Sequence, residues 1–236
     1  MAPTSDRSSD NALELARAGD EASFLLLVDT FGGRLSRLAR EIVDSAPGRA
    51  ETLAREALLG VVRDAPPPGR PSARLWLLRL VIEAARTRWP LEVAVRPEDA
   101  AATEDVPPVP LDGPAQDVLR DALSALPLRH RLPVLLSDGE GCTEAEAAWL
   151  LDITPEEQRV LLRWGRASLH HALRARYGSV PPPGGPLGQL RADGISERSR
   201  NRLLLAFRGS IRVPSRSAAP APHRAPLTSV PRLPSR

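Results

Sequence analysis

"TEAEAAWLLDITPEEQRVLLRWGR", residues 143–166, contains two helix-start signatures eleven residues apart. Thr143 is followed three residues later by Glu146, and Thr154 is followed in the same way by Glu157. In such a capping box, the threonine hydroxyl and the glutamate carboxylate satisfy backbone N–H groups that the first turn of a helix leaves without partners. The spacing therefore predicts two consecutive helices.

The connection between these two helices is too short for anything but a tight turn. Pro155 favours a helix start after Thr154, because the first helical position needs no backbone N–H. Ala147, Ala148 and Leu151 give the first helix an apolar face. Two short helices that cross through a tight turn form a helix-turn-helix. The open question is whether this unit still binds DNA.

Composition indicates an all-α protein. The chain has 236 residues, of which 3% are aromatic and 25 are proline. Long runs of β-branched or aromatic residues, which are typical of strands, are absent. This mixture favours small helical bundles joined by proline-rich connections.

Hydrophobic periodicity predicts two helical bundles. Residues 11–90 carry apolar side chains at spacings of three and four, as in amphipathic helices that bury against one another. Residues 91–113 are rich in proline and acids and are predicted to form a flexible linker between two independently folding units. The helical rhythm returns over 114–178. The rest, 179–236, is a Pro- and Arg-rich tail predicted to be largely disordered, in which 195–208 can form one short basic helix.

All 32 basic residues are arginine, and they are unevenly placed. Residues 191–236 carry 10 arginines against two acids, whereas residues 112–178 carry 8 arginines against 10 acids. The tail, rather than the helix-turn-helix, therefore supplies the excess positive charge. Three uses of the tail remain open: added DNA affinity through counterion release, docking of its helix on this protein or a partner, or a solvated extension.

Several classes of protein are disfavoured by what the chain lacks. The single cysteine, Cys142, excludes an internal disulfide and a cysteine-based zinc site. The N-terminus has no apolar core of a signal peptide, and Arg79 interrupts the most apolar later run. Adjacent His170 and His171 diverge on a helix and do not suit one metal. No nucleophile constellation or phosphate loop is recognisable. We therefore expect a cytoplasmic protein that is not an enzyme, with no metal, no cofactor and no membrane partner.

Three stretches, taken in order, resemble the bacterial extracytoplasmic-function sigma factors, and the resemblance spans about residues 11–178. "AETLAREALL" (50–59) resembles the polymerase-binding helix of that family, and "RLWLLRLV" (74–81) resembles its promoter-melting helix. "LDITPEEQRVLLRWGRASL" (151–169) aligns without a gap with the family's turn and recognition helix. The resemblance implies that the first bundle, sigma region 2, binds core RNA polymerase and melts promoter DNA. It also implies that the second, sigma region 4, binds the minus-thirty-five element, and it adds an anti-sigma factor as a candidate partner.

The same resemblance names candidate contact residues. Those for polymerase are Glu51, Leu53, Arg55 and Glu56. Those for DNA lie on the promoter-melting and recognition helices, and spacings of four and three align the recognition-helix arginines on one face. A solvated face is the alternative interpretation of that alignment. The DNA candidates are Arg79, Arg86, Arg88, Arg159, Arg163 and Arg166.

Departures from the family pattern keep a second function open. Glu83 stands where the promoter-melting helix usually has Asn, and a carboxylate there opposes attraction to phosphates. Glu156 and Glu157 precede Arg159 in the recognition helix, although their charge suits a helix N-terminus. Gln158 occupies a normally apolar position. The alternative is a sigma-derived interaction or regulatory protein that no longer melts promoters. A helix-turn-helix repressor is a third possibility.

Overall fold

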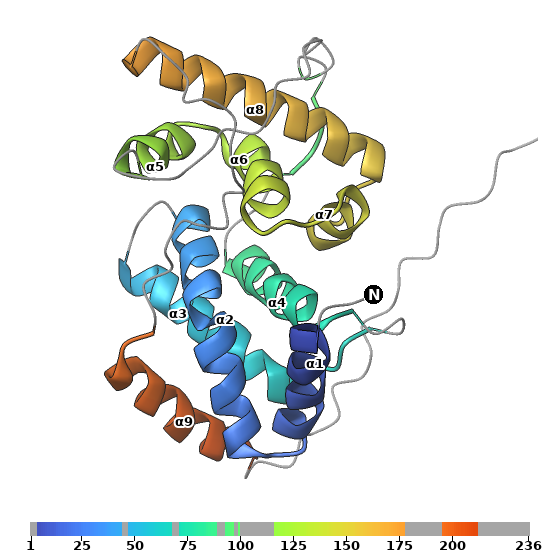
Figure 1. Ribbon diagram of the computed structural model, residues 1–236, viewed down its shortest axis with the longest axis vertical. Helices are drawn as coiled ribbons and strands as arrows, with labels where there is room; N and C mark the ends of the chain where they lie inside the picture. The colour runs from blue at the N-terminus through green and yellow to red at the C-terminus, as the bar shows by residue number, and fades with distance from the viewer. Residues whose placement is uncertain are drawn as a thin grey trace, which may run out of the picture.

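The described part of the chain is built from helices (Figure 1). Every regular element within it is helical, which confirms the predicted all-α fold class. None of its helices combines the length and the apolarity that crossing a bilayer requires. The computed structural model describes residues 4–43, 47–67, 71–88, 93–96, 99, 116–177 and 195–211. Predictions for most of the linker and for residues 178–194 and 212–236 lie outside these ranges.

Four helices form the first group: α1 (Thr4–Arg17), α2 (Glu21–Ile42), α3 (Pro47–Arg63) and α4 (Ala73–Arg88). The carboxylate of Asp20 starts α2 by accepting a hydrogen bond from the Ser23 N–H at 2.8 Å. The predicted apolar stripes of α2, α3 and α4 face one another and are excluded from solvent. Their most buried members include Phe24, Leu27, Leu35, Leu53, Leu58, Leu78 and Ile82.

The second group consists of α5 (Gln116–Ser124), α6 (Leu128–Val134), the π-helical turn η2 (Leu135–Gly139), α7 (Glu144–Leu151) and α8 (Pro155–Tyr177). Pro133 has no N–H to donate, and α6 passes into the wider π-helical turn two residues later, at Leu135. A Cβ at Gly165 of α8 would lie 2.4 Å from the His130 backbone oxygen of α6. Only glycine allows α8 to cross α6 this closely.

The two groups pack directly on one another, with α7 against α4 (Figure 1). One cluster of buried apolar residues continues from the first group into the second through Leu132 and Leu150. Arg37 of α2 donates a hydrogen bond to the Glu140 carboxylate at 2.6 Å, and both side chains are buried. Arg74 of α4 donates to the Glu140 backbone oxygen at 2.7 Å. Because the groups share a core, the prediction of two independently folding units is not confirmed.

Three described positions of the predicted linker are held against the helices. Val93 is buried with the shared apolar cluster. Asp99 is buried against α6 and α8 through hydrogen bonds with His130 and Trp164. Val95 packs against the same cluster, and the flexibility predicted for residues 91–92, 97–98 and 100–113 stays a prediction, since those residues lie outside the described ranges.

A C-terminal helix, α9 (Glu197–Ile211), packs across α2 and α3 (Figure 1). The Phe207 ring stacks on the Phe24 ring of α2 with centroids 4.0 Å apart, and both residues are fully buried. α2 runs through Gly32 as one helix, and this glycine makes room for Ile195, because a Cβ there would lie 2.1 Å from Ile195 Cδ1. The helix expected over 195–208 therefore docks on the protein itself, and it extends to Ile211.

The buried ion pair between the groups yields a stability prediction. Glu140→Gln removes the carboxylate charge from a buried ion pair that joins the two groups, so we expect the free energy of unfolding to fall by about 2 kcal/mol. Urea denaturation followed by circular dichroism should show one cooperative transition in the wild type and in the variant, because the groups share a core.

The matched control is Glu14→Gln. Its carboxylate is exposed and lies 3.8 Å from the Arg17 guanidinium. Loss of such a pair should change the free energy of unfolding by less than about 0.5 kcal/mol. Two separate transitions, or equal stability of the two variants, would contradict the coupling of the groups.

Candidate nucleic-acid interface

The predicted helix-turn-helix lies between α7 and α8, and both predicted capping boxes are confirmed. Thr143 Oγ1 accepts a hydrogen bond from the Glu146 N–H at 3.2 Å, and the Thr143 N–H donates to the Glu146 carboxylate at 2.9 Å. Thr154 and Glu157 form the same reciprocal pair at 3.2 and 2.7 Å. Each pair satisfies N–H groups at its helix start.

The turn between the two helices is closed by Asp152 in the left-handed conformation, with φ 60° and ψ 44°. The N–H groups of Asp152 and Ile153 both donate to the Ala148 backbone oxygen, the latter at 3.1 Å. These bonds satisfy a carbonyl group that the end of α7 would otherwise leave without a partner. Aspartate adopts this conformation more readily than most residues, so the turn needs no glycine.

Arg159 is the exposed arginine of the recognition-helix candidates, and carboxylates surround it. Its guanidinium donates to both Glu144 carboxylate oxygens, at 2.7 and 3.1 Å, and also pairs with Glu156. Roughly half of its side chain, 49%, is exposed to solvent. These contacts partly neutralise the positive charge that phosphates would attract.

The other two recognition-helix arginines are drawn towards the protein. Arg166 donates two hydrogen bonds to the Asp138 carboxylate, at 3.0 and 2.6 Å, and Asp138 is buried in η2. Arg163 is half-buried on the same helix. The predicted face therefore presents Arg159 to solvent, whereas Arg166 fastens α8 to the turn beneath it.

Two of the three α4 arginines expected to contact DNA are engaged with the end of α7. Arg79 donates to the backbone oxygens of Trp149 and Leu150, and its guanidinium lies 5.3 Å from the Trp149 ring centroid. Arg86 donates to the Leu151 backbone oxygen. Burial lowers the pKa of Arg86 from its ordinary value. These cations satisfy carbonyls at the negative end of α7, so they position the helix-turn-helix.

The polymerase-contact candidates on α3 are only partly at the surface. Leu53 is fully buried in the helical core, which leaves its side chain no surface for a partner. Arg55 is exposed. Glu56 pairs with Arg88, the remaining DNA candidate on α4. The Arg88–Glu56 pair therefore links α4 to α3, whereas Arg79 links α4 to α7.

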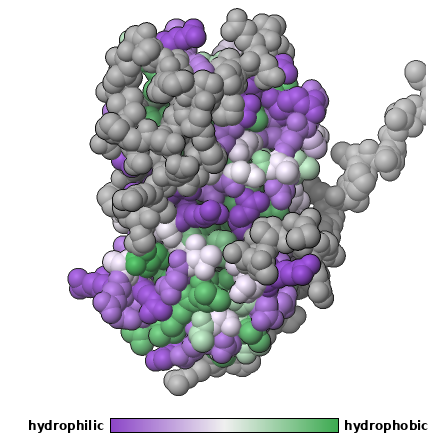
Figure 2. Space-filling view, viewed as in Figure 1, coloured by the Kyte–Doolittle hydropathy of each residue, from purple (hydrophilic) through white to green (hydrophobic). Residues whose placement is uncertain are grey.

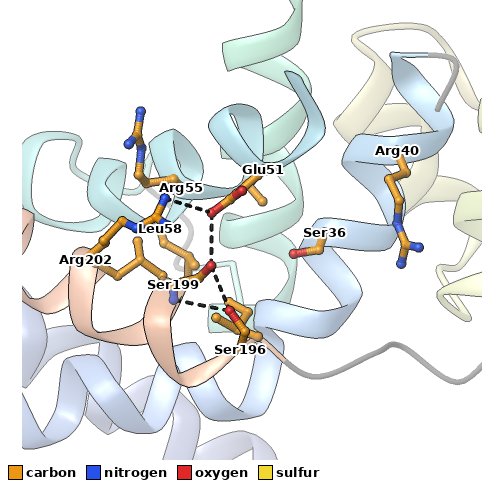
Figure 3. Close-up of a pocket in the computed structure, with 11 residues that line it drawn as sticks. Ser36, Arg40, Glu51, Arg55, Leu58, Ser196, Ser199 and Arg202 are labelled. Carbon is orange, nitrogen blue, oxygen red and sulfur yellow. Dashed lines mark hydrogen bonds and ion pairs between the residues drawn. The ribbon is translucent and has the colours of Figure 1, made fainter. Parts of the chain in front are cut away.

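The fourth α3 candidate, Glu51, faces the C-terminal helix (Figure 3). Its Oε1 accepts a hydrogen bond from Ser199 Oγ at 2.9 Å and lies 3.8 Å from the Arg202 guanidinium. A pocket of about 210 Å³ lies beside this contact, between α2, α3 and the start of α9. Arg40 also lines the pocket, and Figure 3 shows its guanidinium pointing away from Glu51.

A buried polar cluster that the sequence analysis missed holds Asp99 against α6 and α8. The Asp99 carboxylate accepts hydrogen bonds from the Arg96 N–H at 2.7 Å and from Arg129 at 3.2 Å. It lies 2.9 Å from His130 Nε2. Trp164 donates its indole N–H to the Asp99 backbone oxygen and stacks on the His130 ring. No local pattern indicates this cluster, because Asp99 lies in a proline-rich, acidic stretch.

The charge states within this cluster follow from burial and hydrogen bonding. Burial opposes ionisation of Asp99, but the hydrogen bonds outweigh burial and hold its pKa below the ordinary value. Burial also lowers the pKa of His130, because the protonated ring would lose its hydration, and nearby Arg129 adds to this effect. Near pH 7 the pair is therefore a carboxylate beside a neutral imidazole.

Gln158 lies fully buried under the start of α8. Its Nε2 donates to Ser137 Oγ at 3.2 Å, but its Oε1 has no hydrogen-bond partner in the part of the chain that the structure describes. A buried amide oxygen without a donor destabilises the fold. An apolar side chain at this position would avoid that penalty.

No protein-family model matches the sequence, and no curated protein matches it. The resemblance to sigma factors therefore depends on the residues and helices described above.

Gln158 yields a prediction of increased stability. Gln158→Leu removes the unpaired oxygen and fills the site with apolar surface, so the free energy of unfolding should rise by about 1 kcal/mol. Chemical denaturation measures the change. Ser137→Ala is the comparison: it removes the partner of the amide nitrogen and should lower stability. A fall in stability in Gln158→Leu would contradict the interpretation.

His130 yields a prediction of pH dependence. Its folded pKa is lowered, so its contribution to stability is fully present above the unfolded pKa of about 6.5. That contribution is lost as the pH falls from this value through the folded pKa. We expect the free energy of unfolding to fall between pH 7 and pH 5, and to fall less in His130→Gln. An equal fall in both proteins would contradict the assignment.

Proposed function

We propose that the protein is a divergent sigma-type transcription factor that binds core RNA polymerase through its first helical group and promoter DNA through its helix-turn-helix. The observation that carries the proposal is the capped corner between α7 and α8, preceded in the chain by a four-helix group. A recognition helix that follows such a turn is the element that helix-turn-helix proteins place in the major groove. The sigma-like part of the proposal is supported by the order in which the three quoted stretches occur in the sequence.

The charges around α8 define how DNA would bind. Arg159 is the exposed cation near the start of the helix, and Glu144 and Glu156 stand beside it. Phosphate contacts dominate the affinity of such modules, so these carboxylates weaken binding. DNA contact through Arg79 and Arg86 of α4 would require α7 to move away, because both guanidiniums bind its backbone.

The engagement of the α4 arginines also favours a second candidate function, a sigma-derived regulator that binds polymerase without opening promoters. In that case the α4 arginines remain bound to the backbone of α7 and do not contact DNA. Purified protein and core polymerase, assayed for co-elution and then for promoter opening, separate the two functions. Co-elution with opening supports the first, and co-elution without opening supports the second. Loss of co-elution contradicts both.

The acids beside Arg159 yield a prediction for DNA affinity. Glu144→Gln and Glu156→Gln each remove one carboxylate from this cation, so affinity for a random-sequence duplex should rise by about two- to fivefold. Fluorescence anisotropy at low and moderate salt measures it. Arg159→Ala should lower the affinity by a similar factor.

Glu14→Gln is the control for the total charge, because Glu14 lies on α1, in the first helical group. Its affinity for the duplex should match that of the wild type. Equal effects of Glu14→Gln and Glu144→Gln would show that only total charge matters. That outcome would remove α8 as the DNA-binding element.

A further inference from the structure

Helix α9 presents an amphipathic face to the first helical group. Leu203 and Phe207, one turn apart, are its buried residues, whereas Leu205 is 67% exposed. Three arginines flank the buried pair. Each reaches an acid of the first group: Arg200 with Asp29, Arg202 with Glu51, and Arg208 with Glu21.

The surface under α9 has the complementary chemistry. Phe24 supplies an aromatic ring to the centre, and Gly32 leaves a depression that accepts Ile195. Asp29 and Glu21 on α2 and Glu51 on α3 supply an acidic rim. On the outer face of the lower helical group, Figure 2 shows apolar and hydrophilic side chains interleaved, whereas the surface under α9 is covered. An apolar centre with an acidic rim fits a basic helix that carries an aromatic anchor.

The contacts that hold α9 are weaker than those that hold the core helices. Two of its residues are buried, whereas α4 buries nine. The six side chains of its three ion pairs are each at least 37% exposed. Exposed ion pairs contribute little and are screened by salt. The docking of α9 therefore rests mainly on Leu203 and Phe207.

The position of α9 overlaps the candidate polymerase contacts on α3. Glu51 binds Ser199 and Arg202 directly, and Arg55 lines the pocket that these α9 residues also line (Figure 3). A partner that contacts Glu51 must displace these two α9 side chains. The same surface cannot accept α9 and another helix at once.

We infer that α9 covers the α2–α3 surface and competes with polymerase for it. On this inference, α9 occupies the site at which a basic amphipathic helix of the polymerase would bind. The inference rests on the proposed function for the identity of the partner. Only the fraction of molecules with α9 released binds polymerase, so the apparent affinity is reduced by that fraction. While α9 is docked, Phe24 stays out of solvent.

The test uses the full chain in forms that loosen α9 and leave α3 unchanged. Arg200→Glu combined with Arg208→Glu replaces two ion pairs by contacts between like charges, and Phe207→Ala removes the aromatic anchor. Hydrogen exchange of the α9 amides should accelerate in both variants. Affinity for core polymerase should increase by about tenfold in Phe207→Ala and by a smaller factor in the double variant, because the released fraction grows in both and Phe207 contributes more to docking than the exposed ion pairs.

Arg198→Glu is the matched control. It makes one Arg→Glu change on the same helix, half the charge change of the double variant, and Arg198 forms no ion pair with Asp29, Glu21 or Glu51. Its exchange and affinity should equal those of the wild type. Faster exchange with unchanged polymerase affinity overturns the cover and leaves the proposed function intact. Unchanged exchange in the double variant overturns the role of the ion pairs. Absence of polymerase binding by every form, wild type included, overturns the proposed function and the inference with it.

Discussion

The carbonyl groups at the end of α7 are the constraint that orients the helix-turn-helix on the rest of the protein. A helix of eight residues leaves half of its carbonyls without intrahelical partners. The turn at Asp152 satisfies the Ala148 carbonyl group. Arg79 and Arg86 of α4 satisfy the carbonyl groups of the next three residues, 149–151. Since α8 follows α7 through a tight turn, these arginines also set the position of α8. The Arg37–Glu140 pair and the shared apolar cluster then fix the same arrangement from the α2 side.

This use of arginine explains why the charge of the protein is a poor guide to its surface. A guanidinium carries five donors in a planar fork, so it can satisfy several acceptors at once. Arg166 grips the buried Asp138 carboxylate in this way, and Arg79 spans two backbone oxygens. Much of the positive charge on α4 and α8 is therefore paired with acceptors within the protein. As a result, the positive field at the surface of these helices is weaker than the number of arginines indicates.

The C-terminal segment uses arginine in a similar way on the first helical group. Arginines of α9 meet acids on α2 and α3, and Phe207 completes an aromatic pair with Phe24. The tail thus contributes to the core as well as to the charge. Because α9 covers Glu51, contact of α3 with a polymerase is coupled to release of the tail helix under the proposed function.

The sequence by itself determined the local structure. Capping boxes at Thr143 and Thr154, the apolar stripes and the basic helix near the C-terminus are all set by neighbours within one or two turns, so their patterns could be read directly. Tertiary structure decided which partner each polar group found. Asp99 meets His130, Gly165 admits the α6 backbone, and Arg79 and Arg86 turn to α7 instead of to solvent. These pairings join residues far apart in the chain, and many acceptors compete for the same arginines. Only packing of the whole core selects among them, because no local spacing distinguishes an arginine that binds phosphate from one that caps a distant helix.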